Sequence, residues 1–285
     1  MFVHGLEGYN PRLVVSALAV NYGAVRFGVL FLSVVDVDLV ALGRTVEELG
    51  FESLFMPEHT HCAAGFLRDH PEETDYYGGM ARMFDPFVAL AAVASVTRTL
   101  RLGTGICLVP QHDPIVLAKQ VATLDRVSGG RLMFGIGAGW VPAEAAHHGV
   151  AFDRRFDVMR DYVAAMQALW TGREVSHAGE FVQFDGVRSL DPVQQPHPPI
   201  LIGGAGAKAR AAVAEYGDGW MPIHPFDPAA DVAPQDTTVC FFAGTDDDDI
   251  VAGYAAAGVH RCVVVADPDD RADLERLAAR AARYG

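Results

Sequence analysis

The chain has few cysteines and no long apolar run, and both absences narrow the class of protein. Its four cysteines, Cys62, Cys107, Cys240 and Cys262, are widely spaced and contain no C-x-x-C pair. This pattern favours reduced, buried thiols in a cytoplasmic protein. No apolar run is long enough to span a bilayer, so we expect no attachment to a membrane.

Positive charge is also scarce. The sequence has 22 Lys and Arg against 36 Asp and Glu, which gives a formal net charge of -14. This excess of acid argues against electrostatic binding of nucleic acid or acidic membranes. Because 51% of the residues are hydrophobic and only 20% are charged, the chain can form a large core. Its 285 residues are close to the size of one α/β barrel.

The first 25 residues stand apart from the rest. An apolar stretch at 13–20 follows Arg12, as in a signal peptide, but it is short and lacks a clean small-residue cleavage site. We therefore expect residues 1–25 to be a loosely attached N-terminal extension. No low-complexity linker divides the remainder, so residues 26–285 are predicted to be a single domain.

From residue 26 onward, short apolar runs alternate with helical patterns. Strands are predicted at 26–32, 53–56, 100–109, 131–136, 199–202, 219–223, 237–242 and 260–266. Between them, one helix is predicted to have Asp36 as its N-cap and to stop at Gly50, and another to begin at Asp113 and Pro114. The strands are almost continuously apolar, as parallel strands covered by helices are. About eight strand–helix units predict an α/β protein with a closed (β/α)₈ barrel.

Two segments interrupt this alternation. The Tyr- and Gly-rich segment 74–83 is predicted to form a loop over the barrel mouth. Segment 180–190 resembles a hairpin inserted before the fifth strand.

In such a barrel the active site lies at the C-terminal ends of the strands. Glu58 and His59 follow the second strand, and a histidine there can donate or accept a proton near pH 7. A polar surface cluster explains the same residues equally well. A metal site is a further alternative, built from His59, His61, Cys62 and His70. We expect no metal, because no second anchored cluster accompanies them.

Glycines follow three later strands. After the third strand, Gly103 and Gly105 indicate either close approach of a ligand or a bulge that closes the barrel. After the fourth, the glycines at 135–139 lack the G-x-G-x-x-G spacing, and no clean helix begins directly after them, which disfavours a Rossmann nucleotide site.

A glycine turn also follows the fifth strand. It consists of Gly203, Gly204, Ala205 and Gly206 and leads into a helix. Backbone N–H groups at such a helix start bind phosphate, and Lys208 adds positive charge; the alternative is an ordinary turn. Trp220, after the sixth strand, is either a core residue or the wall of a cofactor site.

Three segments of the chain together resemble one protein family. They are residues 41–59, ending EELGFESLFMPEH; residues 100–140, with LAKQVATLD and SGGRL; and residues 192–222, with PHPPI and IGG. In this order they resemble the luciferase-like monooxygenases, in particular the actinobacterial branch that uses the deazaflavin coenzyme F420. The resemblance covers roughly residues 26 to 223.

The resemblance implies an oxidoreductase that transfers a hydride between F420 and a small organic substrate. An FMN-dependent monooxygenase using O2 and a cofactor-free binding barrel remain alternatives. His59 is the residue expected to handle the proton, with Glu58 beside it. The ring of the cofactor is expected to lie over a non-prolyl cis peptide at Gly105–Ile106. Residues expected to bind the cofactor are Thr104, Gly105, Ile106, Cys107, Gly137, Ala138, Gly139 and, around its phosphate, Gly203, Gly204, Ala205 and Gly206. Relatives of this kind often form homodimers, and we expect one here.

The chain also departs from the family. Trp140 stands where some deazaflavin dehydrogenases carry a catalytic glutamate, and the next acid is Glu144. The segment 226–237 is shorter than in the family, so the substrate side or the closure of the barrel is expected to differ. Tyr76, Tyr77 and Trp140 are candidates for the walls of the substrate pocket.

Overall fold

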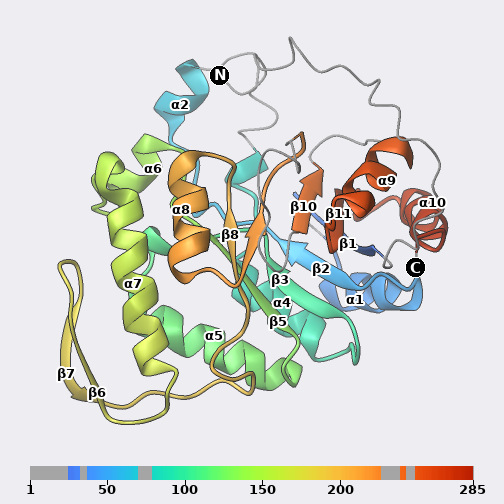
Figure 1. The fold of residues 1–285 in the computed structure, drawn as a ribbon. Coiled ribbons are helices and arrows are strands. Elements are labelled where there is room, and N and C mark those ends of the chain that lie inside the picture. Colours follow the sequence, from blue (N-terminus) through green and yellow to red (C-terminus); the bar gives the residue numbers. More distant parts are fainter. Residues whose placement is uncertain (1–24, 33–36, 70–78, 226–237, 242–247, 285) are drawn as a thin grey trace.

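The computed structural model of the chain describes residues 25–32, 37–69, 79–225, 238–241 and 248–284. Figure 1 shows a curled sheet with helices packed around its outside. Within the described ranges, no helix combines the length and the apolar character that crossing a bilayer requires.

The main sheet is parallel and follows the order of the chain. Its strands are β1 (Arg26–Leu30), β2 (Ser53–Met56), β3 (Arg101–Thr104), β4 (Cys107–Leu108), β5 (Leu132–Gly137), β8 (Ile200–Gly203), β9 (Gly219–Met221), β10 (Thr238–Phe241) and β11 (Arg261–Val265). Their order is β10-β11-β1-β2-β3-β5-β8-β9, with β4 pairing with β5 beyond the end of β3. The two ends of this order, β9 and β10, adjoin each other, so the sheet curls around as a barrel. The predicted α/β barrel is thus confirmed.

Helices connect the strands and cover the outer face of the sheet. They are α1 (Leu39–Glu48), α4 (Pro86–Ala94), α5 (Pro114–Ser128), α7 (Arg155–Leu169), α8 (Ala207–Tyr216), α9 (Asp248–Ala256) and α10 (Arg271–Ala281). Shorter elements lie in the loops at the strand ends: α2 (Ala64–Asp69), η2 (Val109–Gln111), α6 (Pro142–His147) and η3 (Phe152–Arg154). The prediction for α5 is confirmed: Asp113 accepts hydrogen bonds from Ile115 and Val116, Pro114 is its first residue, and Gly129 ends it with a φ of 71°.

Some predicted boundaries are wrong. Helix α1 begins after Asp38 rather than Asp36, because the Asp38 carboxylate accepts hydrogen bonds from the N–H groups of Val40 and Ala41. The inserted hairpin begins earlier than 180, with β6 at Val175–Ala178 and β7 at Gln183–Val187. Its residues alternate between half-buried and exposed, so no continuous apolar run marks it. Residues 1–24, the first half of the predicted loop at 74–78, and 226–237 lie outside the described residues.

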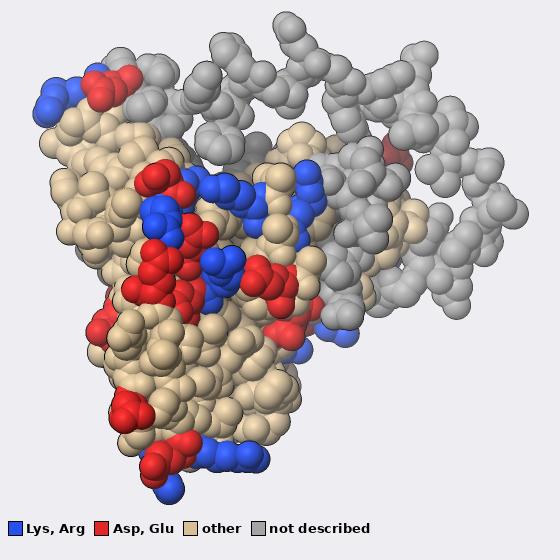
Figure 2. All heavy atoms as spheres, turned by 60° about the vertical axis from the view of Figure 1, so that its left-hand side comes forward, with Lys and Arg blue, Asp and Glu red and all other residues tan. Residues whose placement is uncertain are grey.

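The hairpin folds back along α7. Asp161 on α7 accepts hydrogen bonds from Nε2 of His177 at 2.7 Å and from the backbone N–H of Phe181 at 2.6 Å. Arg154 at the start of α7 pairs with Glu180 and Asp157. Figure 2, which brings this side of the molecule forward, shows acidic and basic side chains intermixed on the surface.

Two apolar layers hold the barrel together. The inner layer fills the barrel with Leu30, Phe55, Met133, Leu201, Met221 and Val263, all at most 2% exposed. The outer layer packs alternate strand residues, such as Leu54 and Phe134, against the helices. Each fully buried side chain of this kind contributes about 1.5–3 kcal/mol.

An ion pair joins strands at the N-terminal end of the barrel. Arg261, fully buried at the start of β11, donates to Glu52 from Nε at 2.7 Å and from Nη2 at 2.8 Å, and to Thr238 from Nη1 at 2.9 Å. Glu52 immediately precedes β2, and Thr238 begins β10. The loops that carry the candidate site lie at the opposite, C-terminal end of the strands.

Candidate functional site

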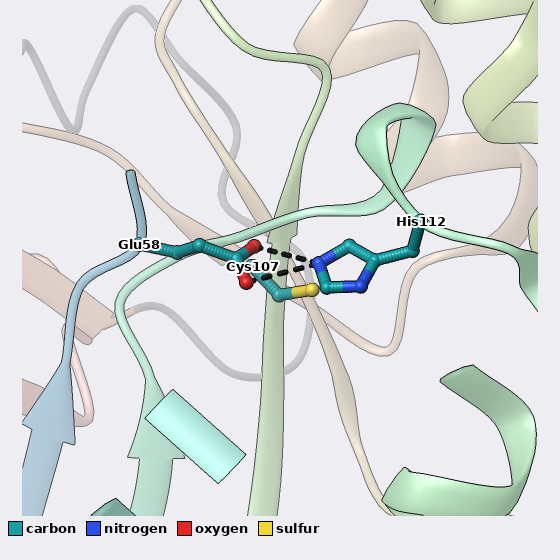
Figure 3. Close-up of side chains that lie close together, drawn as sticks. All are labelled: Glu58, Cys107 and His112. Carbon is teal, nitrogen blue, oxygen red and sulfur yellow. Dashed lines mark hydrogen bonds and ion pairs between the residues drawn. The ribbon is translucent and has the colours of Figure 1, made fainter. Parts of the chain in front are cut away.

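Glu58 follows β2 and turns into the wall of the barrel. Its side chain is buried, and Oε2 accepts a hydrogen bond from the backbone N–H of Leu108 at 2.6 Å. Nε2 of His112 lies 2.9 Å from Oε1 and 3.0 Å from Oε2. Figure 3 shows these two side chains with Cys107 beside them. Glu58 therefore ties the end of β2 to β4 and to the turn before α5.

The charges of this cluster follow from its burial. Burial alone would lower the pKa of His112, but the hydrogen bond and the charge of Glu58 raise it above its ordinary value. Burial and the Glu58 carboxylate raise the pKa of the Cys107 thiol well above its ordinary value. The three ligand atoms lie within 4.8 Å of one another, so these residues have the donors for a metal ion. Leu108 and His112 already satisfy the carboxylate, so the cluster is also complete as a hydrogen-bonded ion pair.

His59, the next residue, pairs with a different acid. Its Nδ1 lies 2.8 Å from Oε2 of Glu144, and the Glu144 side chain is only 1% exposed. The Thr60 backbone N–H donates to Oε1 of Glu144 at 2.9 Å, and the side chain of Gln111 adds a further hydrogen bond. Burial alone would raise the pKa of Glu144, but these hydrogen bonds, that of His59 foremost, lower it overall.

An ionised carboxylate can only accept hydrogen bonds. Nδ1 of His59 must therefore carry the proton of the 2.8 Å contact, and Nε2 is the ring nitrogen that can gain or lose a further proton. Trp140 meets the His59 ring edge-on at 5.9 Å between centroids, and meets Phe66 at 5.6 Å. The arrangement provides a fixed proton acceptor beside an aromatic side chain.

The sequence prediction missed this role of Glu144. Helix α6, which carries it, begins at Pro142, only one residue after Trp140 and Val141. A short helix thus follows soon after the fourth-strand glycines, although it does not begin directly after them. The signal available was the proline followed by Ala-Glu-Ala-Ala, but a helix of six residues has no apolar period to reveal it.

The bulge predicted after the third strand is present, with a cis peptide between Gly105 and Ile106. The glycines of the neighbouring strands make room for it. A Cβ atom on Gly137 would overlap Cδ1 of Ile106, and one on Gly203 would lie 2.8 Å from the same atom. Ile106 itself is half-buried at the top of the inner core.

Two other residues predicted to bind the cofactor have buried side chains. Thr104 donates from Oγ1 to the carbonyl of Gly135 at 2.6 Å, and Cys107 belongs to the outer core. Ala138 is 6% exposed, while Gly139 is half-buried with a φ of 82°. At Thr104 and Cys107, only the backbone is therefore in a position to contact a ligand over the barrel.

The turn predicted to bind phosphate leads into α8. Gly204 has a φ of 99°, Ala205 and Gly206 are exposed, and no side chain caps the N-terminus of α8. Lys208 is exposed one residue into the helix. Trp220 is 1% exposed and donates from Nε1 to the carbonyl of Gly204 at 2.7 Å, so it is a core residue that supports the turn.

The remaining residues singled out in the sequence do not join the pair of His59 and Glu144. His61 bonds to Thr60 and His147 rather than to His59. Cys62, Cys107 and Cys262 are free thiols, of which Cys107 and Cys262 are buried as predicted. His70, Tyr76 and Tyr77 lie outside the described residues.

Comparisons with known proteins agree with this architecture. The chain is 40% identical over 197 residues to an uncharacterized protein of Mycobacterium tuberculosis, covering 68% of this chain and 70% of the relative. It is 26% identical over 190 residues to the F420-dependent hydroxymycolic acid dehydrogenase of the same organism, covering 64% of this chain and 48% of that protein.

Solved structures share the fold. The monooxygenase RslO1 from Streptomyces bottropensis superimposes with a TM-score of 0.69 at 22% identity, covering 91% of this chain and 98% of that one. The oxygenating constituent of 3,6-diketocamphane monooxygenase from Pseudomonas putida, in complex with FMN, gives a TM-score of 0.59 at 17% identity, covering 76% and 67%. The family model described as luciferase-like monooxygenase matches residues 29–284. The chain therefore belongs to the luciferase-like monooxygenase family, a family of α/β-barrel enzymes.

Proposed function

We propose that this enzyme transfers a hydride between coenzyme F420 and a small organic substrate. The observation that carries the proposal is the bond from Nδ1 of His59 to Glu144, which leaves Nε2 of His59 free to take up or release the proton that accompanies the hydride. The F420-dependent dehydrogenase among the relatives supports the choice of cofactor. The cofactor, when bound, supplies the hydride chemistry, and the protein supplies position and proton transfer.

The residues at the C-terminal ends of the strands fit a flat cofactor with an anionic tail. The exposed turn at Gly204, Ala205 and Gly206 precedes a helix start that no side chain caps, so its N–H groups are available to a phosphate. Gly204 has a φ of 99°, which L side chains rarely adopt, so glycine suits this position. Because glycine has no side chain, a ligand can approach its backbone closely. The half-buried Ile106 on the bulge would support the ring.

The other residues of the site would act around this geometry. Backbone atoms of Thr104, Gly105, Cys107, Gly137, Ala138, Gly139 and Gly203 would contact the cofactor. Glu58 would have a positioning role. It accepts the hydrogen bond of the Leu108 N–H, which holds β4 and thereby the adjacent bulge in place. Trp140 would border the substrate next to His59.

The homodimer expected from the family resemblance stays a prediction. Val88 on α4, together with Ile115 and Val116 on α5, is 41–72% exposed and offers an apolar surface for it. Light scattering of the purified protein measures its mass, and a monomer at micromolar concentration would contradict the expectation.

Equilibrium titration with F420 and with FMN tests the proposed cofactor. The change in fluorescence of each ligand reports its binding, and oxygen uptake with reduced FMN reports monooxygenase chemistry. We expect F420 to bind at least tenfold more tightly than FMN, with no oxygen uptake. Tight binding of FMN alone would establish the monooxygenase alternative, and binding of neither would favour a cofactor-free barrel.

A further inference from the structure

A chain of hydrogen bonds leads from the surface to Glu144, and the proposed function does not use it. Thr60 is its centre. Oγ1 of Thr60 lies 3.3 Å from Oε1 of Glu144, 2.8 Å from Nδ1 of His61 and 2.9 Å from Nε2 of His148. Nε2 of His61 lies in turn 2.8 Å from Nδ1 of His147. His147 and His148 are exposed, whereas Glu144 is buried.

The contact between His61 and His147 is a hydrogen bond rather than a stack of rings. Their planes differ by 26°, and their centroids are 5.0 Å apart. The centroids are farther apart than the two nitrogens by about two ring radii, so the rings meet edge to edge. His61 therefore uses both ring nitrogens, one toward Thr60 and one toward His147.

The donor and the acceptor of each hydrogen bond in this series follow from the Glu144 carboxylate. Its carboxylate only accepts, so the hydroxyl of Thr60 donates its single hydrogen to Glu144. His61 and His148 must then donate to Thr60 from Nδ1 and Nε2. In the tautomer that carries its hydrogen on Nδ1, His61 has Nε2 as an acceptor, and this nitrogen receives the Nδ1 hydrogen of His147. Every donor thus points from the surface toward Glu144, and the final donor, the Thr60 hydroxyl, bonds to the carboxylate that holds His59.

We propose that Thr60 is a positioning residue for the Glu144–His59 pair, and that His61 and His148 keep its hydroxyl directed at Glu144. The inference rests on the proposed function in giving His59 the proton-handling role. The Thr60 backbone N–H and hydroxyl hold Oε1 of Glu144, and Oε2 thereby faces Nδ1 of His59. Without the hydroxyl, Oε1 of Glu144 loses one of its hydrogen bonds, so the carboxylate is held less firmly and the preference of His59 for the Nδ1–H tautomer weakens.

Nitrogen-15 NMR of the histidine rings tests this directly, because the two tautomers differ in their ring-nitrogen shifts. The His59 signals are assigned by their loss in His59→Gln. In Thr60→Val, which keeps the shape of the side chain, we expect them to move toward the average of both tautomers. In Thr60→Ser, which keeps the hydroxyl, they should stay as in the wild type. His61→Phe should give a smaller shift in the direction of Thr60→Val.

A matched control is Thr171→Val, at an exposed threonine just after α7 whose hydroxyl donates to the carbonyl of Ala168 and accepts from the N–H of Arg173. It should leave the His59 signals unchanged. Identical His59 signals in wild type and Thr60→Val, or a Thr60→Ser spectrum like that of Thr60→Val, would overturn the proposal. If Thr60→Val fails to fold, His61→Phe decides by the same criterion. F420 titration of the same samples keeps the two proposals apart, since absent binding in every protein refutes the cofactor assignment and leaves the NMR result intact.

Discussion

Nδ1 of His59 lies 2.8 Å from Oε2 of Glu144, although 85 positions separate the two residues in the chain. The pair joins the loop after β2 to helix α6 after β5. Because the strands are parallel, both segments emerge at the same end of the barrel. A carboxylate that orients one imidazole nitrogen and leaves the other free is a common arrangement for a general base.

Replacing Glu144 with Gln should weaken catalysis more than cofactor binding. The amide keeps the size of the side chain but loses the charge that selects the Nδ1–H tautomer. We expect turnover of the F420-dependent reaction to fall about 10–100-fold, with an F420 affinity within about twofold of the wild type. Steady-state kinetics and F420 titration measure the two effects. Glu215→Gln, at an exposed position of α8, is the control, and equal turnover in both variants would contradict the role of Glu144.

The stability of the protein should fall in acid partly through Glu47. Oε1 of Glu47 accepts hydrogen bonds from the N–H groups of Arg98, Thr99 and Leu100. Burial alone would raise the pKa of Glu47, but these bonds lower it from 4.5 to about 2. A carboxyl with a lowered pKa stabilises the fold above its unfolded value and loses this contribution as the pH falls from about 4.5 toward about 2.

Urea unfolding of wild type and Glu47→Gln at several pH values checks this. At pH 7 the variant should have a free energy of unfolding about 1–2 kcal/mol lower than the wild type. The difference should shrink as the pH falls below about 4.5. A difference that is independent of pH between 7 and 3 would show that the charge of Glu47 contributes nothing.

Gly137 should resist enlargement because of Ile106. A Cβ atom there would overlap Cδ1 of Ile106, so Gly137→Ala should lower the free energy of unfolding by about 1–3 kcal/mol. Ile106→Val shortens the opposing side chain and should recover part of the loss in the double variant. The control is Gly253→Ala in α9, where a Cβ meets nothing within 4 Å; it should stabilise slightly. Thermal unfolding measures the wild type and these four variants, and purely additive effects at Gly137 and Ile106 would contradict the contact.

Thiol labelling should distinguish the cysteines. Burial raises the pKa of Cys262 to about 12, and burial with the Glu58 carboxylate raises that of Cys107 well above its ordinary value. Neither should react with a disulfide reagent in the folded protein at pH 8, whereas the half-buried Cys62 should. Mass spectrometry of the labelled peptides identifies the sites, and Cys62→Ser is the control. Rapid labelling of Cys107 would show that the wall of the barrel opens.

The sequence predicts the barrel well because the buried parallel strands are continuously apolar. All eight strand regions are found, and Asp113 with Pro114 marks the start of α5 through a local hydrogen-bonding requirement. The family resemblance implied the cis peptide at Gly105–Ile106, and the glycine motif predicted the turn before α8.

What the sequence did not reveal depends on contacts between distant segments. Glu144 acts through His59, and nothing local to the six-residue helix α6 indicates that partner. The partners of Glu58 were equally hidden in the sequence. Its neighbour His59 faces Glu144, while Glu58 itself turns toward Leu108 and His112. Two adjacent polar residues thus serve different partners, which only the three-dimensional path of the loops determines.

The most direct test of the cofactor site is an F420 titration of Ala205→Glu beside Ala211→Glu. Both positions are exposed, but only Ala205 lies in the turn before α8, where a carboxylate would repel an anionic tail. We predict that Ala205→Glu weakens F420 binding at least about tenfold, while Ala211→Glu binds as the wild type does. Equal affinity of Ala205→Glu and wild type, or no binding by the wild type, would contradict a cofactor held by this turn.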